Sequence, residues 1–184
     1  MNDGELVIGI SGGVAAYKSA ILVSQLIQSG ARVTVVMTPA AQQFIGSATF
    51  QALTGRAVID DVFDKAYPLG PHIELAERAA LLCVAPATAN FLAKAAHGLA
   101  DDVLSTLYLS FTGPVLLAPA MNCEMWEKPA VQRNVARLKQ DGAHLVGPAE
   151  GWLSCRRKGA GRMAEPNDIV QAIRIAWDET CRES

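Results

Sequence analysis

The sequence predicts an α/β fold with three layers, doubly wound in the Rossmann or flavodoxin-like manner around a parallel sheet. Short apolar runs alternate along the chain with stretches whose apolar residues have helical spacing. The runs are apolar at successive positions, which is typical of strands that are covered on both faces. Because strands and helices alternate, right-handed crossovers are expected to place helices on both sides of one sheet.

The expected elements follow in order along the chain. Strands are expected at Leu6–Ile10, Ala31–Met37, Ala80–Ala85, Pro114–Ala118 and Ala143–Val146. Helices are expected at Ala15–Gln28, Thr88–Ala96, Asp101–Phe111, Glu127–Lys139 and Asn167–Ala176. The first helix stops at Ser29 and Gly30, and glycine is common just after a last helical turn. These elements account for most of the chain.

The segment 46–71 is less regular, because Gly55, Pro68 and Gly70 interrupt any long element. We expect it to be an insertion at an active site or an interface. No internal repeat or low-complexity tract marks a second unit. Residues 1–184 are therefore expected to form a single domain.

Composition narrows the class of function. With a formal charge of −2 and interspersed charges, the chain has no basic footprint for nucleic acid or anionic lipid, so a small-molecule ligand is expected. The apolar fraction of 51% leaves surface for an oligomer interface. Scattered cysteines and the absence of a signal-like N-terminus indicate reduced thiols in the cytoplasm. Neither the histidines nor the cysteines have metal-ligand spacing, so no metal is expected.

A glycine-containing turn, residues 9–18, joins the first strand to the first helix. Gly12 and Gly13 let backbone N–H groups approach an anion at a helix N-terminus, where a phosphate is the natural guest. The turn is neither a Walker loop nor a G-x-G-x-x-G motif. The phosphate of a mononucleotide such as FMN therefore fits better than a dinucleotide. A tight turn without a ligand is the alternative interpretation.

Two other strands end in hydroxyl residues with small neighbours. Thr38 and Ala40 follow the second strand, and Thr88 begins the run Thr88-Ala89-Asn90 after the third. Carboxyl ends of parallel strands share one edge of a sheet, so these residues are expected to face the same crevice as the glycines. Thr88 alone could simply cap a helix.

Two polar side chains are candidates for chemistry near these strand ends. His72 follows Pro71 at the start of a short helix, although for a lone histidine local hydrogen bonding is the simpler interpretation. Asn122 follows the strand that ends near Pro119, where its amide can bind a carboxylate or amide of a substrate. Met125 and Trp126 are expected to be packing residues.

Cys155 lies beyond the last expected strand in a segment containing Gly151, Gly159 and Gly161. Such a segment has little to hold it rigid, and we expect it to act as a mobile lid. The nearby residues Arg156, Arg157 and Arg162 would stabilise a thiolate or contact a phosphate. A free surface cysteine without a function is the alternative.

Five segments of the sequence carry a resemblance to one family. They are 9–18, Pro71–Ile73, Pro86–Asn90, the octad Pro119–Trp126 and Ser154–Met163. Together they resemble the homo-oligomeric flavin-containing cysteine decarboxylases over residues 5 to about 176. The octad is highly specific, and the glycine turn is only moderately so.

The resemblance implies a bound FMN and three catalytic residues. The residues that it implies for FMN are Gly12, Gly13, Val14, Thr38, Ala40, Thr88, Ala89, Asn90, Phe91 and Ala120. His72 would orient the substrate carboxylate or act as base, against a flavin bound mainly by a neighbouring subunit. Asn122 would hold the carboxylate, and Cys155 would donate a proton. Homotrimers, or dodecamers assembled from four trimers, are implied as well.

The most similar branch of the family comprises carboxy-lyases that act on 4′-phosphopantothenoyl-cysteine in coenzyme A biosynthesis. There the cysteine moiety is oxidised to a thioaldehyde with FMN as acceptor, the carboxylate leaves as CO₂, and the enethiolate is reduced to give 4′-phosphopantetheine. A C=S group provides the electron sink that a thiol lacks, so oxidation must come first. A phosphopantothenate–cysteine ligase, fused or separate, would supply the substrate.

Two departures from the family pattern affect the expected site. Asp102 stands where the family commonly has an asparagine, which leaves a polar contact there open. Thr88 replaces one hydroxyl residue by another, and Phe91 replaces a hydroxyl residue beside the expected flavin. The affinity for FMN is therefore expected to differ from that of other members of the family.

The main alternative is a peptidyl-cysteine decarboxylase, which acts on the C-terminal cysteine of a lantibiotic-type precursor. Such enzymes typically lack the cysteine-bearing, glycine-rich segment, so Ser154–Met163 favours the coenzyme A branch. Flavin prenyltransferases do not share the octad. Non-catalytic regulators with this fold usually carry long acidic tails, which this sequence does not have.

Overall fold

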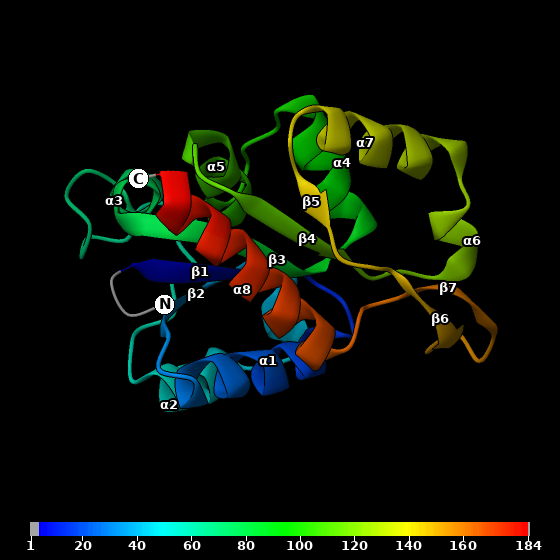
Figure 1. The fold of residues 1–184 in the computed structure, drawn as a ribbon, viewed down its shortest axis with the longest axis horizontal. Coiled ribbons are helices and arrows are strands. Elements are labelled where there is room, and N and C mark those ends of the chain that lie inside the picture. The colour runs from blue at the N-terminus through cyan, green and yellow to red at the C-terminus, as the bar shows by residue number, and fades with distance from the viewer. Residues whose placement is uncertain (1–3, 184) are drawn as a thin grey trace.

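The computed structural model describes residues 4–183 and forms one layered α/β unit (Figure 1). The strands are β1 Glu5–Ile10, β2 Arg32–Met37, β3 Ala79–Ala87, β4 Val115–Pro119, β5 His144–Leu145, β6 Ala149–Trp152 and β7 Lys158–Arg162. The helices are α1 Ala16–Gln28, α2 Ser47–Thr54, α3 Pro71–Arg78, α4 Ala89–His97, α5 Val103–Ser110, α6 Cys123–Trp126, α7 Pro129–Gln140 and α8 Pro166–Glu183. A short 3₁₀ turn covers Ala41–Gln43.

Strands β1 to β5 form a parallel sheet in the order β2-β1-β3-β4-β5. This is the flavodoxin-like order, in which the chain reverses its winding direction beside β1 and β3. Every residue of β1 is buried, which agrees with strands covered on both faces. The predicted fold class and all five predicted strands are confirmed.

Helices cover both faces of the sheet. One apolar cluster joins the sheet to α1, α2 and α8 through residues such as Leu22, Phe50 and Ile173. A second joins the opposite face to α3, α4, α5 and α7, with Leu75 and Leu138 among its members. Figure 1 shows these two layers on either side of the sheet. Within the described residues, no helix combines the length and the apolar character needed to span a membrane.

Several boundaries differ from the expectations. The segment 46–71 is not irregular throughout, because α2 occupies Ser47–Thr54 and ends at Gly55 in a left-handed conformation. The helix expected from Glu127 begins only at Pro129, since the four-residue helix α6 precedes it and proline suits a first helical position. The last helix extends past Ala176 as far as Glu183.

The glycine-rich segment around Cys155 was expected to have little to hold it rigid, but the structure has regular secondary structure over much of residues 149–162. This segment forms an antiparallel hairpin from β6 and β7. Its glycines allow close packing: a Cβ on Gly159 would lie 2.8 Å from Cβ of Cys123 on α6. Glycine in a strand often marks such a close approach, which periodicity alone does not reveal.

A buried carboxylate helps to hold the amino edge of the sheet. Glu5 on β1 is 6% exposed, and it accepts hydrogen bonds from Arg56 Nη1 at 2.7 Å and Arg78 Nε at 2.6 Å. The hydroxyl of Thr34 also donates to it. The group thus ties β1 to β2, to α3 and to the segment after α2.

Replacing Glu5 by glutamine is expected to lower the free energy of unfolding by about 1–3 kcal/mol, because two half-exposed guanidinium groups lose their charged acceptor. Urea unfolding followed by circular dichroism measures this change. The control is Glu77→Gln, an exposed position on α3. Equal unfolding midpoints for the two variants would contradict a stabilising role for Glu5.

Candidate active site

A pocket of about 530 Å³ opens at the carboxyl ends of the central strands. It is lined by Gly12, Gly13, Val14, Ala15, Tyr17, Lys18, Thr88, Ala89, Asn90, Ala120, Met121, Asn122, Met125, Trp152, Leu153, Ser154, Gly161, Arg162 and Met163. Four segments far apart in the sequence therefore meet in one cavity: the glycine turn, the start of α4, the end of β4 with α6, and the hairpin.

The glycine turn is packed tightly against the end of β2. A Cβ on Gly12 would lie 2.7 Å from the carbonyl carbon of Ala40, so only glycine fits there without a backbone shift. Gly13 accepts a hydrogen bond from the N–H of Ala16 at 3.0 Å, which starts α1 beside the pocket. The N–H groups of Tyr17 and Lys18 donate to the carbonyls of Val14 and Ala15, so an anion would be bound by N–H groups of the turn that precedes Ala16, at the positive end of the helix dipole.

A buried serine, which the sequence interpretation missed, joins two of the strand ends. The hydroxyl of Ser11 donates to the carbonyl of Pro86 at 2.7 Å and accepts from the N–H of Thr88 at 2.9 Å. Thr88 in turn accepts from the N–H of Phe91 and caps α4. Ser11 thus fixes the spacing between the glycine turn and α4. The sequence signal that could have identified Ser11 is its position at the end of a predicted strand.

Three of the residues expected at the flavin do not line the pocket. Thr38 is buried, and its hydroxyl accepts from the N–H of Ala41 at 3.2 Å. Ala40 stands behind Gly12. Phe91 is 2% exposed and packs edge-on against Tyr108 with 5.9 Å between ring centroids. Thr38 and Phe91 are therefore buried outside the pocket lining, whereas Ala40 is exposed and contacts the glycine turn.

The carboxylate at Asp102 has a structural explanation. Asp102 caps α5, and its side chain accepts from the N–H of Ser105 at 2.9 Å. It also accepts from Lys94 Nζ on α4 at 2.8 Å. The carboxylate therefore fixes the junction between α4 and α5 and does not line the pocket.

Asn122 lies in the pocket wall with one of its two polar atoms already used. Oδ1 accepts from the N–H of Glu124 at 2.7 Å and caps α6. This bond sets the orientation of the amide, so Nδ2 remains available to donate to a ligand. The neighbouring side chains Met121 and Met125 add apolar surface to the same wall.

The hairpin forms one wall of the pocket and carries Cys155 at its tip. Trp152, Leu153 and Ser154 line the cavity, whereas the exposed Cys155 lies just outside it. The N–H of Leu153 donates to the carbonyl of Arg157 at 2.9 Å and closes the turn. At the base, the N–H of Met121 donates to the carbonyl of Gly161 at 2.8 Å.

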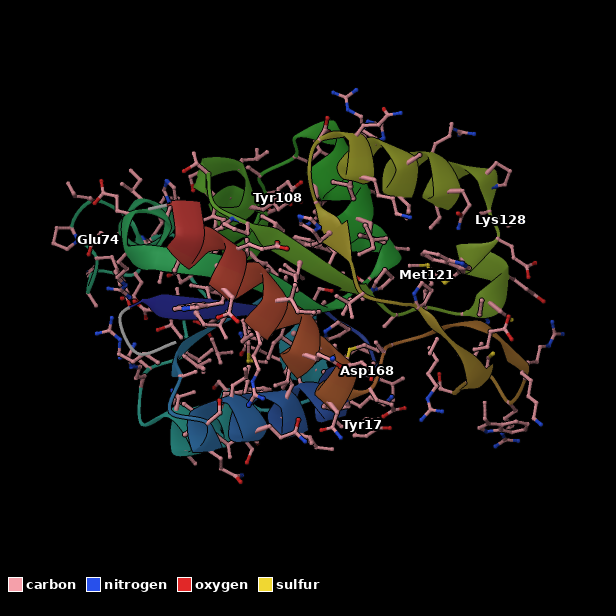
Figure 2. The ribbon with its side chains drawn as sticks, viewed as in Figure 1. Tyr17, Glu74, Tyr108, Met121, Lys128 and Asp168 are labelled. Atoms are coloured by element: carbon pink, nitrogen blue, oxygen red, sulfur yellow. The ribbon has the colours of Figure 1, made fainter. Side chains whose placement is uncertain are left out.

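His72 lies far from this pocket. It belongs to α3, and Figure 2 shows Glu74 of α3 at the opposite end of the molecule from Met121. The carbonyl of His72 accepts from the hydroxyl of Ser110 at 3.3 Å. Its Nδ1 is buried without a hydrogen-bond partner. The structure therefore brings Asn122 and the hairpin together but leaves His72 apart from them.

Residues 1–176 match the family model described as Flavoprotein. The chain belongs to this family. The coenzyme A biosynthesis bifunctional protein CoaBC of Bacillus subtilis (strain 168) is 46% identical over 172 residues, which cover 93% of this chain and 42% of that protein. CoaBC of Mycobacterium tuberculosis (strain H37Rv) is 47% identical over 171 residues, 93% and 41%. The chain thus spans about two-fifths of the length of these curated relatives.

Solved structures agree with this family membership. The FMN-dependent cysteine decarboxylase SpaF superposes with a TM-score of 0.85 at 35% identity, covering 98% of each chain. A cysteine-to-serine variant of a PPC decarboxylase, complexed with pantothenoylaminoethenethiol, superposes with a TM-score of 0.86 at 31% identity, covering 96% of this chain and 99% of that one.

Two cations in the pocket wall received no definite role from the sequence. Lys18 is buried, and its Nζ donates to the carbonyl of Met163 at 3.2 Å and to Glu165 Oε1 at 3.0 Å. Arg162 Nη2 lies 2.7 Å from the same oxygen. The hydrogen bond from Lys18 holds the pKa of the Glu165 carboxyl below its usual value. The residue spacing offered no signal for Lys18, because its partners come from a distant segment.

Proposed function

We propose that this chain is an FMN-dependent decarboxylase that converts 4′-phosphopantothenoyl-cysteine to 4′-phosphopantetheine in coenzyme A biosynthesis. The observation that carries the proposal is the single pocket in which the glycine turn, the Asn122 amide and the hairpin meet. The relatives named CoaBC and the PPC decarboxylase structure support it. A fold alone would not, because related folds serve many functions.

The pocket fits a flavin mononucleotide. The glycine turn would bind the flavin phosphate through its backbone N–H groups, next to the positive end of the α1 dipole. Small or apolar side chains such as Val14, Ala89 and Ala120 line the cavity beside the turn, and such a lining suits an aromatic ring system. The pocket residues that would contact FMN are Gly12, Gly13, Val14, Thr88, Ala89, Asn90 and Ala120, whereas Thr38, Ala40 and Phe91 lie outside the pocket lining. When bound, FMN supplies a two-electron acceptor and donor in one place.

The side chains of this chain have separate tasks in the proposed reaction. Nδ2 of Asn122 donates to the substrate carboxylate and orients it. The thiol-bearing carbon of the substrate loses a hydride and the thiol loses a proton, which gives a thioaldehyde. The C–C bond to the carboxylate then breaks, and its electron pair moves into the thioaldehyde to leave an enethiolate and CO₂. Cys155 donates a proton as the enethiolate is reduced, once the hairpin closes over the pocket.

The position of His72 supports a centre shared between subunits. In one chain it is too far from Asn122 to act on the same substrate, and its buried Nδ1 has no partner. We therefore propose a homo-oligomer in which His72 of one copy orients the carboxylate, or takes the thiol proton, at the pocket of the next. A closed trimer, alone or within a dodecamer, gives each copy one such neighbour.

The same proposal includes the location of the domain and the enzyme that supplies its substrate. Residues 1–184 act as one flavoprotein domain in the cytoplasm. The phosphopantothenate–cysteine ligase that supplies the substrate is part of the same longer protein or a separate one. The bifunctional relatives, of which this chain spans about two-fifths, support this partnership.

Gly12→Ala is expected to weaken FMN binding by about ten-fold or more, because the added methyl group displaces the glycine turn from the backbone of Ala40. Titration of the apoprotein by flavin fluorescence quenching measures the affinity. The control is Gly46→Ala, since a Cβ at Gly46 meets no atom within 4 Å. Unchanged affinity in the Gly12 variant would show that the turn does not hold the cofactor.

The proposed function is tested in two stages. The purified protein should be yellow, with a flavin spectrum that disappears when FMN is removed. Incubation with 4′-phosphopantothenoyl-cysteine, and separately with a peptide that ends in cysteine, should then release CO₂ only from the first. Release from the peptide alone would replace the proposal by a peptidyl-cysteine decarboxylase.

A further inference from the structure

Two cations share one carboxylate oxygen in the pocket wall. Glu165 Oε1 lies 3.0 Å from Lys18 Nζ and 2.7 Å from Arg162 Nη2. Lys18 and Arg162 both line the pocket, and Lys18 also donates to the carbonyl of Met163. One carboxylate cannot neutralise two cations, so this cluster leaves one positive charge facing the pocket.

The cluster is held in place before any ligand arrives. The side chain of Lys18 is only 6% exposed, and α1 carries it into the wall. The guanidinium of Arg162 lies across the hairpin, since a Cβ on Gly151 would come within 3.1 Å of its Nη1. A guanidinium has five N–H donors arranged in a planar fork, and the contact with Glu165 occupies Nη2. Other donors of the fork can therefore bind a second anion.

We propose that Arg162, positioned by Glu165 and assisted by Lys18, binds the phosphate group of the substrate. The inference rests on the proposed function. It extends that function from the cysteine end of the substrate, where the reaction occurs, to the phosphate at the other end. The proposed function assigns the flavin phosphate to the glycine turn and the substrate carboxylate to Asn122, both of which line the pocket. The terminal phosphate of the substrate is thus the anion that remains without a partner.

This assignment has a consequence for substrate choice. A peptide that ends in cysteine carries no phosphate, so it would leave Arg162 without a second anion in the pocket wall. The Arg162 side chain is partly exposed, at 40%, so water compensates part of this charge, but a phosphate that pairs with it gains an attraction that a peptide without a phosphate does not have. The cluster would therefore favour the phosphorylated substrate over a peptide.

The test compares 4′-phosphopantetheine with pantetheine as ligands of the FMN-loaded protein, by calorimetry. The parent protein should bind the phosphorylated ligand about ten-fold more tightly. Arg162→Gln should bring the two affinities close together by weakening only the phosphorylated ligand, and Arg162→Lys should keep part of the preference because it keeps the charge. Arg137→Gln, which removes an exposed ion pair with Asp141 on α7, is the matched control and should change nothing.

Glu165→Gln separates positioning from simple charge. This change raises the net charge of the cluster by one, so a purely electrostatic attraction would increase the phosphate preference. If Glu165 positions the Arg162 fork, the preference should fall instead. A rise would overturn the positioning role of Glu165.

Other outcomes would overturn the assignment of Arg162. If Arg162→Gln still preferred the phosphorylated ligand as strongly as the parent protein does, Arg162 would not bind the substrate phosphate. If the FMN content of this variant also fell, Arg162 would instead be assigned to the flavin phosphate. Turnover of phosphorylated and unphosphorylated pantothenoyl-cysteine at equal kcat/KM by the parent would remove the subsite while leaving the decarboxylase function intact. If the parent protein turned over neither substrate, both the phosphate subsite and the proposed decarboxylase function would be contradicted.

Discussion

Mixed oligomers of two inactive variants, His72→Asn and Asn122→Asp, are expected to recover activity. His72 lies on α3, far from the pocket that contains Asn122 of the same chain. If each centre takes its histidine from a neighbour, about one centre in three of every mixed trimer that tandem purification selects has both groups intact. Each variant alone should lose at least about 100-fold in turnover. Co-expression with two affinity tags, followed by tandem purification and CO₂ release, measures the recovery.

Both variants are chosen to leave the fold unchanged. An aspartate at 122 keeps an oxygen to cap α6 at the N–H of Glu124, and it replaces the amide donor by a charged oxygen that repels a carboxylate. Asparagine at 72 approximates the position of one ring nitrogen. Both should retain FMN at the parental content. Tandem-purified oligomers that bear two tags on the same variant serve as controls, and a mixture no more active than these controls would contradict a centre shared between subunits.

Cys155→Ser is expected to release CO₂ but to stop before the final reduction. Cys155 is exposed at the tip of the hairpin whose preceding residues line the pocket, and a hydroxyl is a much weaker proton donor than a thiol. The enethiol product should accumulate while the flavin stays reduced. Mass spectrometry of the product and the absorbance of the flavin report the two halves of this result. The relative with a cysteine-to-serine change was captured with pantothenoylaminoethenethiol, which supports the expectation.

The control for this experiment is Glu150→Gln, an exposed position on β6 of the same hairpin that does not line the pocket, and this variant should complete the full reaction. A complete yield of 4′-phosphopantetheine from Cys155→Ser would remove the proton-donor assignment. A loss of CO₂ release would instead place Cys155 at an earlier step than the one proposed.

The parallel sheet could be predicted because its strands are continuous apolar runs. Such runs are legible without tertiary information, since both faces of each strand are buried. The hairpin was missed because its stability comes from contacts across the chain. Gly159 packs against Cys123, and the carbonyl of Gly161 accepts from Met121. A segment with three glycines predicts a loop, because the sequence does not show that Cys123 and Met121 lie next to it.

The candidate site shows the same limit. The glycine turn, Thr88 and Asn122 follow strands, so topology brings them to one edge and the sequence indicates that edge. Lys18 and Glu165 are far apart along the chain, and only the folded structure shows their contact. Phe91 was expected at the flavin from its position in the motif. In the structure its ring packs against Tyr108 in the apolar core instead.

The most direct test of the central claim is anaerobic turnover of carboxyl-labelled 4′-phosphopantothenoyl-cysteine by the FMN-loaded protein, with no added oxidant or reductant. Because the electrons removed from the substrate return to it, many CO₂ should be released per flavin, and 4′-phosphopantetheine should form in equal amount. Release that ends at a single CO₂ per flavin, or that requires oxygen, would contradict the account.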